Sequence, residues 1–175
     1  MMKKKSQIWV EASIYLALGI IILTLVIGAG VPVINKLRDK NTVIQTKELM
    51  STLDNNIREV VNEGPGSRRQ VRLFVRRGEF TIDELNEGIQ WEITTKALLS
   101  EPGIEIPEAN LVILTKKTPV KDEYETKLWL NYTDYIDLDL VGQTTSFIGT
   151  YDLLITNIGI QQPTQTLPTV TLEQI

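Results

Sequence analysis

The spacing of hydrophobic positions changes twice along this chain. Residues 12–35 form a run of 24 residues without a charged side chain, and about 20 apolar residues suffice for a helix to cross a bilayer. From there to residue 63, apolar side chains recur three, four or seven positions apart with charged residues between them, which predicts an amphipathic helix. Beyond Gly66 the period becomes two and turn signals come about every ten residues, which predicts antiparallel strands.

The two helical patterns join into one predicted helix over residues 7–63. Its rear half carries an apolar stripe on Ile34, Leu37, Ile44, Met50, Leu53, Ile57, Val60 and Val61. Gly64-Pro65-Gly66 ends the helix, because glycine caps a helix and proline cannot continue one. Residues 8–63 alone would extend about 84 Å at 1.5 Å per residue. Pro32 predicts a kink, since it removes a hydrogen bond; the alternative is two helices broken at Gly30-Val31-Pro32.

Alternating positions predict about seven strands in the rest of the chain. They lie near residues 71–76, 80–85, 89–94, 110–115, 124–132, 135–141 and 150–158, with corners at Arg77-Gly78 and Asn86-Glu87-Gly88. The predicted fold class is therefore α+β: a long N-terminal hydrophobic helix followed by an antiparallel β-sandwich or curved-sheet head over residues 67–160.

Residues 161–175 form a predicted tail that contains two prolines and four threonines. We expect it to be disordered in the isolated subunit. An exposed extended strand, an O-glycosylated tip and a strand added to a neighbour's sheet are the other interpretations.

The amino-acid composition excludes several kinds of chemistry for this chain. The chain contains no cysteine and no histidine, which excludes disulfides, thiol chemistry and the side chain most often used as general base or transition-metal ligand. Its net charge of −4 gives no support to nucleic-acid binding. We expect a protein that is not an enzyme and that holds no cofactor or metal.

The charges at the N-terminus predict an orientation in the membrane. Lys3, Lys4 and Lys5 would hold the start of the chain on the cytoplasmic side, so that everything after Val31 lies outside. Glu11 stands at the front edge of the apolar run, where an unpaired carboxylate is costly. One interpretation is that Glu11 sits in the headgroup region, solvated or paired with a nearby lysine.

The N-terminal pattern also resembles that of the type IV pilin family, in particular archaeal pilin-like proteins. The resemblance covers residues 3–35: a basic leader ending in a small residue, then Gln7-Ile8-Trp9-Val10-Glu11, then an apolar helix. It implies that a membrane prepilin peptidase cuts between Ser6 and Gln7, which makes residues 1–6 a leader peptide. It further implies that Glu11, then the fifth residue, docks on the free amino terminus of an adjacent subunit.

Two other interpretations of this segment stay open. Gly28-Ala29-Gly30 matches the small-x-small site at which an ordinary secretory signal is cut. The segment is also suited to an uncleaved membrane anchor. Against ordinary cleavage, the apolar run is longer than a typical signal core, and Pro32 follows the site closely.

Three clusters in the head are candidate sites. Arg68, Arg69, Arg72, Arg76 and Arg77 are dense enough for an anion or nucleic-acid patch, although Arg72 and Arg76 share a predicted strand face. Asp134, Asp137 and Asp139 carry oxygen ligands suited to calcium, but their alternation with apolar residues is typical of the wet side of a strand. Glu123 and Glu125 are an acid pair of a kind common in acidic chains.

Asn131-Tyr132-Thr133 is an N-glycosylation sequon, which has meaning only if the head lies outside the cell.

Taken together, the leader, Glu11, the long helix and the β head predict a structural subunit of a type IV pilus-like extracellular filament. The expected partners are identical subunits in a helical homo-oligomer, the prepilin peptidase and the pilus assembly machinery, with the membrane as partner before assembly. The alternative is an uncleaved, single-pass, membrane-anchored extracellular binding module that never forms fibres.

Overall fold

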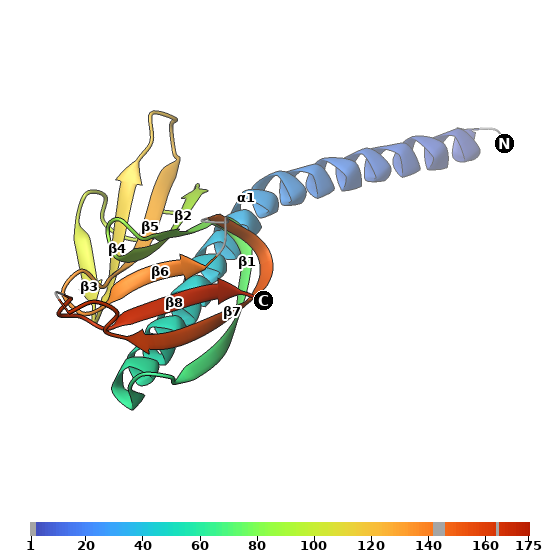
Figure 1. The fold of residues 1–175 in the computed structure, drawn as a ribbon. Helices are drawn as coiled ribbons and strands as arrows, with labels where there is room; N and C mark the ends of the chain where they lie inside the picture. The colour runs from blue at the N-terminus through green and yellow to red at the C-terminus, as the bar shows by residue number, and fades with distance from the viewer. Residues whose placement is uncertain (1–2, 142–145, 164) are drawn as a thin grey trace. The chain divides into compact units, whose positions relative to one another are not determined.

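The computed structural model describes residues 3–141, 146–163 and 165–175, with side chains from residue 8 onward. It contains one helix, α1 (Lys3–Glu63), followed by strands (Figure 1). The chain divides into two compact units, Met1–Arg38 and Asp39–Ile175, and α1 contributes to both. The helix is continuous through Pro32, so the prediction of two helices broken at residues 30–32 is wrong. A bend at Pro32 stays a prediction.

Eight strands form a single sheet. They are β1 (Arg68–Asp83), β2 (Gly88–Thr95), β3 (Glu105–Glu108), β4 (Leu111–Lys117), β5 (Tyr124–Asn131), β6 (Asp137–Val141), β7 (Ser146–Gly159) and β8 (Thr169–Gln174). Their order is β3-β4-β5-β2-β1-β7-β8-β6. The pairs are antiparallel except β6 with β8, which is parallel. The sheet curls around the part of α1 that belongs to the second unit (Figure 1). The α+β class with a curved-sheet head is confirmed.

The part of α1 in the second unit buries one stripe of side chains. The stripe recurs at three and four positions, and its members are Asp39, Val43, Thr46, Met50, Leu53, Asp54, Ile57 and Val60. Ile44, which the sequence pattern placed on the apolar face, is 44% exposed. It lies next to Val43, and one position is about 100° of rotation on a helix with 3.6 residues per turn. The stripe includes three polar residues, Asp39, Thr46 and Asp54, that the hydrophobic pattern did not include.

The core joins this stripe to the inner face of the sheet. One cluster of buried hydrophobic side chains contains Met50, Leu53 and Ile57 of the helix together with residues of the strands, among them Phe80 and Trp91. Inner and outer positions alternate along β1 and β2, as expected for a sheet with one covered face. This core holds α1 and the sheet together as one unit.

The corner predicted at Arg77-Gly78 is instead an irregularity inside the long strand β1. The register with β7 shifts between Val75 and Phe80. Gly78 has φ 80°, and a Cβ there would lie 2.4 Å from the carbonyl oxygen of Glu92 and 2.8 Å from the Trp91 ring. Only glycine fits this position, so the strand bends there without ending.

The C-terminal segment belongs to the sheet. β8 pairs with β7 on one side and with β6 on the other, and Val170 and Leu172 are fully buried. The disordered or exposed tail expected for residues 161–175 is therefore wrong for β8. The strand was missed because the prolines and threonines of this segment are typical of an exposed tail, although Val170 and Leu172 alternate with threonines.

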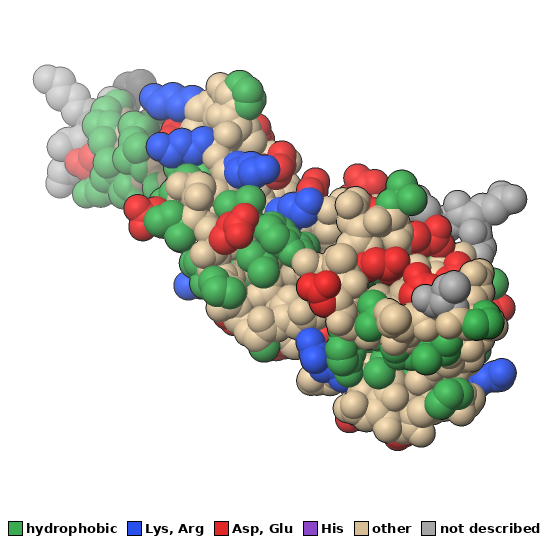
Figure 2. Space-filling view, turned by 60° about the vertical axis from the view of Figure 1, so that its left-hand side comes forward, with side chains coloured by type: hydrophobic (Ala, Val, Ile, Leu, Met, Phe, Trp, Pro, Cys, Tyr) green, Lys and Arg blue, Asp and Glu red, His purple; other side chains and the backbone are tan. Residues whose placement is uncertain are grey.

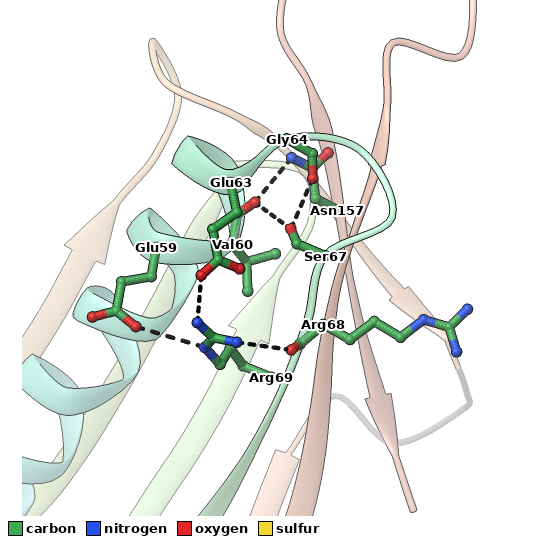
Figure 3. Close-up of polar contacts among 8 residues, drawn as sticks. All are labelled: Glu59, Val60, Glu63, Gly64, Ser67, Arg68, Arg69 and Asn157. Atoms are coloured by element: carbon green, nitrogen blue, oxygen red, sulfur yellow. Dashed lines mark hydrogen bonds and ion pairs between the residues drawn. The ribbon is translucent and has the colours of Figure 1, made fainter.

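The end of α1 is hydrogen-bonded to the sheet (Figure 3). The carbonyl oxygen of Val60 accepts hydrogen bonds from the Ser67 hydroxyl (2.5 Å) and from Nδ2 of Asn157 on β7 (3.2 Å). Gly64, with φ 93°, follows the helix, and the Gly66 N–H donates to the Asn157 carbonyl (2.7 Å). Carbonyls of a last helical turn lack partners within the helix, and Asn157, buried on a strand far along the chain, supplies one.

Candidate functional site

The first unit presents an uncovered apolar surface, which we call the apolar segment (residues 8–37). All described side chains of residues 8–29 are exposed, including Trp9 at 76% and Leu25 at 68%. Helix α1 is long and apolar enough to cross a membrane, and the apolar stretch that makes it so is not buried. Figure 2 shows hydrophobic side chains crowding this part of the surface. Apolar surface of this extent requires a cover of lipid or protein.

Glu11 is the one acidic residue of the apolar segment, and its side chain is exposed. Helix α1 runs through Ser6 and Gln7, whose side chains lie outside the described part of the chain. Cleavage between those two residues and docking through Glu11 both stay predictions.

The arginine cluster is largely paired with acids. Three members bind carboxylates: Arg69 binds Glu63 and Glu59, Arg72 binds Asp152, and Arg77 binds Asp39. The guanidinium of Arg76 lies 4.7 Å from the centre of the Phe74 ring, and Arg68 points away from the helix end in Figure 3. The hydrogen bond to Asp152 raises the pKa of Arg72 and correspondingly lowers that of Asp152. Ion pairs within the head account for most of this cluster.

A buried carboxylate that the sequence analysis missed lies on the helix at Asp54. Its oxygens accept hydrogen bonds from the Tyr132 hydroxyl (2.9 Å), Asn110 Nδ2 (3.0 Å) and Arg58 Nε (2.9 Å). Burial, with the neighbouring Asp54 charge, raises the pKa of Tyr132. The signal was present in the sequence, because Asp54 stands next to Leu53 and three positions before Ile57 on the apolar stripe. The network connects the helix to the segments before β4 and after β5.

A second buried acid, Asp39, stands where the second unit begins. It accepts a hydrogen bond from the Thr95 hydroxyl (2.5 Å) and forms an ion pair with Arg77. Burial alone would raise the pKa of Asp39, but the bonds from Thr95 and Arg77 outweigh it and lower the pKa. These contacts attach α1 to β1 and β2 at its first buried position.

One member of the aspartate cluster, Asp137, takes part in the hydrogen bonding between strands. Asp137 Oδ2 accepts hydrogen bonds from Gln165 Nε2 (2.7 Å) and from the Thr169 hydroxyl (3.2 Å), which ties β6 to β8. Asp134 precedes β6 and Asp139 lies on it, both exposed. Among the described residues, no three histidine, cysteine, aspartate or glutamate side chains are grouped to hold a metal ion.

The two residues of the acid pair lie at the start of β5. Glu123 lies in the turn before β5, and its carbonyl accepts from the Thr118 N–H (3.2 Å). Glu125 lies on β5 between Lys116 of β4 and Thr94 of β2. A cationic cross-strand neighbour for Glu125 is what an exposed sheet face usually provides.

The sequon lies at the exposed end of β5. Asn131 Oδ1 accepts hydrogen bonds from the Thr133 N–H (3.0 Å) and the Thr133 hydroxyl (2.7 Å). The same hydroxyl lies 3.3 Å from the carbonyl oxygen of Asn86 in the β1–β2 turn. The structure therefore places the sequon beside this turn, a juxtaposition that the sequence did not reveal.

Comparison of this chain with protein-family models, with curated proteins and with solved structures found no match.

Proposed function

We propose that this protein is a structural subunit of a type IV pilus-like extracellular filament, built by packing of the apolar segments of identical subunits. The observation that carries the proposal is the complete exposure of residues 8–29 on a helix whose other part is held by a well-packed head. The second unit buries its own hydrophobic side chains in one core. The first unit has no cover within the described chain and is suited to a cover of lipid before assembly and of other subunits after it.

The physical problem in such an assembly is the exchange of neighbours. Helices in lipid gain little hydrophobic free energy from packing together, because lipid tails are as apolar as their own side chains. Extraction from the membrane therefore needs an external energy source, which an assembly machinery supplies. Glu11 gives the packing its specificity, since an acid in an apolar environment is stable when a cation pairs with it. The amino terminus of a neighbouring subunit, created by cleavage before Gln7, is that cation.

Amino-terminal sequencing of filaments sheared from the native cell surface tests the proposal. A start at Gln7 is expected, because removal of residues 1–6 creates the amine that pairs with Glu11. A start at Met1 means an uncleaved anchor, and a start at Val31 means an ordinary secretory signal. Native material found only as single membrane-bound molecules with the leader intact would contradict the proposal and favour the anchored binding module.

Glu11→Gln tests the role of the acid. It removes the charge and keeps the size, so we expect at least a tenfold loss of filaments while the head stays folded; about 1.4 kcal/mol corresponds to a factor of ten. Glu48→Gln is the matched control, because Glu48 is an exposed acid of the same helix in the second unit. Electron microscopy counts the filaments, and circular dichroism of the purified chain reports the fold. Equal numbers of filaments in the two variants would mean that the Glu11 charge has no role in assembly.

A further inference from the structure

A groove of about 430 Å³ lies on the outer face of the sheet, at the start of β2 and the end of β5. Leu128 and Leu130 of β5 are buried, whereas Trp129 and Asn131 point to the other face, as alternation along a strand requires. Trp129 and Asn131 both line the groove, and Leu85, 95% exposed, stands at its rim. The volume is within the range of about 300–1,000 Å³ found for small-molecule sites.

The register of the two strands leaves room beside Asn131. Trp129 lies opposite Gln90, and Asn131 lies opposite Gly88, which has no side chain. Two residues along a strand span about 6.8 Å, so the Trp129 and Asn131 backbone positions are about that far apart, with both side chains on the same face of β5. A group attached to the Asn131 amide would meet the Trp129 ring over the gap that Gly88 leaves.

The sequon is folded so that its reactive nitrogen is available. Asn131-Tyr132-Thr133 is the one Asn-x-Ser/Thr sequence in the chain. Both hydrogen bonds recorded for the Asn131 amide use its oxygen, Oδ1, as acceptor from Thr133. In the described part of the structure, no hydrogen bond is recorded from Asn131 Nδ2, the atom to which an N-linked glycan is joined.

We propose that Asn131 carries an N-linked glycan whose first pyranose ring packs on Trp129 and fills this groove. The C–H bonds of a sugar ring are slightly positive and suit the negative face of an indole. Gln90, also in the groove, provides amide groups that can hydrogen-bond the sugar hydroxyls. This inference rests on the part of the proposed function that places the head outside the membrane, which the anchored-module alternative shares.

The covalent step requires a lipid-linked oligosaccharide phosphate as donor, used by an oligosaccharyltransferase on the outer side of the membrane. The bond from Asn131 Nδ2 to the anomeric carbon forms, and the bond from that carbon to the phosphate oxygen breaks. The lipid phosphate leaves with the electron pair, and Nδ2 loses one proton to a base of the transferase. No redox change is involved.

The walls of the groove are held rigidly before any sugar arrives. Asp83 accepts hydrogen bonds from the N–H groups of Leu85 (3.1 Å) and Asn86 (3.2 Å) and from the Asn86 side chain (2.7 Å). The Tyr132 N–H donates to the Glu87 carbonyl (2.8 Å), which joins the sequon to the β1–β2 turn. A rigid site loses less conformational entropy when it binds a ligand.

The mass of the native protein tests the modification. No lysine or arginine lies within residues 128–175, so trypsin leaves these residues in one peptide, which contains the whole sequon. We expect this peptide from the native surface protein to carry the mass of an oligosaccharide, which Asn131→Gln and Thr133→Ala remove and Thr133→Ser retains. A bare peptide from native protein would overturn the proposal, whatever the amino-terminal start at Gln7 says about filament assembly.

Hydrogen exchange of the full-length chain in detergent tests the packing on Trp129. Residues 85–88 and 131–133 should exchange several-fold more slowly in the glycosylated chain than in Asn131→Gln. Trp129→Ala should abolish this difference, and Trp129→Tyr, which keeps an aromatic face, should retain most of it. Equal slowing in the Trp129→Ala background would show that the glycan does not use the groove.

Discussion

Single side chains decide how firmly the helix is held to the sheet. Asp54 accepts three hydrogen bonds, and its partners Tyr132 and Asn110 come from segments 78 and 56 residues away along the chain. The Tyr132 side chain is fully buried, so its hydroxyl cannot turn to water if Asp54 is lost. A buried donor without a partner costs about 1–3 kcal/mol.

Asp54→Ala should therefore destabilise the second unit more than Tyr132→Phe does. The first variant leaves the donors of Tyr132, Asn110 and Arg58 without their acceptor. The second removes one donor and leaves the carboxylate with two partners, at a cost of about 1.5–3 kcal/mol for one hydrogen bond to a charged group. Urea unfolding of the full-length chain, followed by tryptophan fluorescence, gives both values. A smaller loss in Asp54→Ala than in Tyr132→Phe would contradict this view of the network.

At the scale of elements, both edges of the sheet are protected from pairing with other chains. β3 contains Pro107, which lacks an N–H, at one edge. At the other edge, the Leu140 N–H of β6 donates to Glu84 (2.6 Å), and the Leu138 N–H donates to Glu87. Open edges promote unspecific aggregation. These protected edges agree with the proposed function, in which copies of the chain associate through the apolar segment and not through the sheet.

The Leu138 N–H of β6 donates a hydrogen bond to the Glu87 carboxylate. This contact, which we call the β6 cap, predicts a difference between two variants of Glu87. Glu87→Ala should speed hydrogen exchange at the Leu138 amide by about tenfold, because an unpaired edge amide opens readily. Glu87→Gln keeps an oxygen that accepts the same bond and should stay close to the wild type. Exchange measured by mass spectrometry at residues 137–141 separates the two. Equal rates in all three chains would mean that the cap does not protect the edge.

The environment of Glu87 also predicts the direction in which the free energy of unfolding changes with pH. Burial, together with the nearby charge of Asp137, raises the pKa of Glu87, although the bond from Leu138 opposes the shift. Folding then favours the protonated form, so this contribution to stability is complete below the unfolded pKa of about 4.3. It is lost as the pH rises through the folded pKa. Gln cannot ionise and resembles the protonated carboxyl, so Glu87→Gln should be the more stable chain at neutral pH, where the wild-type Glu87 is ionised at a cost. The difference in unfolding free energy between the two chains, measured by urea unfolding at several pH values, should narrow toward low pH.

At the scale of the whole molecule, the buried core and the exposed apolar surface belong to different units. The described core side chains all lie between Val43 and Leu172, inside the second unit, whereas residues 8–29 bury nothing. The packing of the head therefore involves none of residues 8–29. The apolar segment, in turn, needs a bilayer or other copies around it.

Removal of residues 1–35 should consequently yield a folded monomer that is soluble without detergent. The shortened chain keeps Asp39 with its Thr95 and Arg77 partners, and therefore the first contact of the second unit. Light scattering after size-exclusion chromatography gives the oligomeric state, and circular dichroism shows whether the sheet is retained. Aggregation or loss of the β signal would show that the apolar segment supports the head.

Much of the fold was readable from the spacing of apolar residues, because burial on one face imposes a period of two or 3.6. That period located α1 and most of the strands. It missed β3, a short exposed edge strand, and β8, whose threonines hid the alternation. The sequence analysis also predicted a corner at Gly78, because an Arg-Gly pair is typical of a turn. The structure shows another reason for the glycine, which is the close approach of the Trp91 ring.

The sequence by itself determined that this protein has an apolar N-terminal part and a separate head. Residues 12–35 carry no charged side chain, and a run of 24 such residues is long and apolar enough to suit a bilayer or other copies of itself. Only the tertiary structure decided which polar groups meet: Asp54 with Tyr132, Asp39 with Arg77, and the sequon with the β1–β2 turn. Local patterns report which face of an element is buried, whereas partners distant in the chain are chosen by strand order and register.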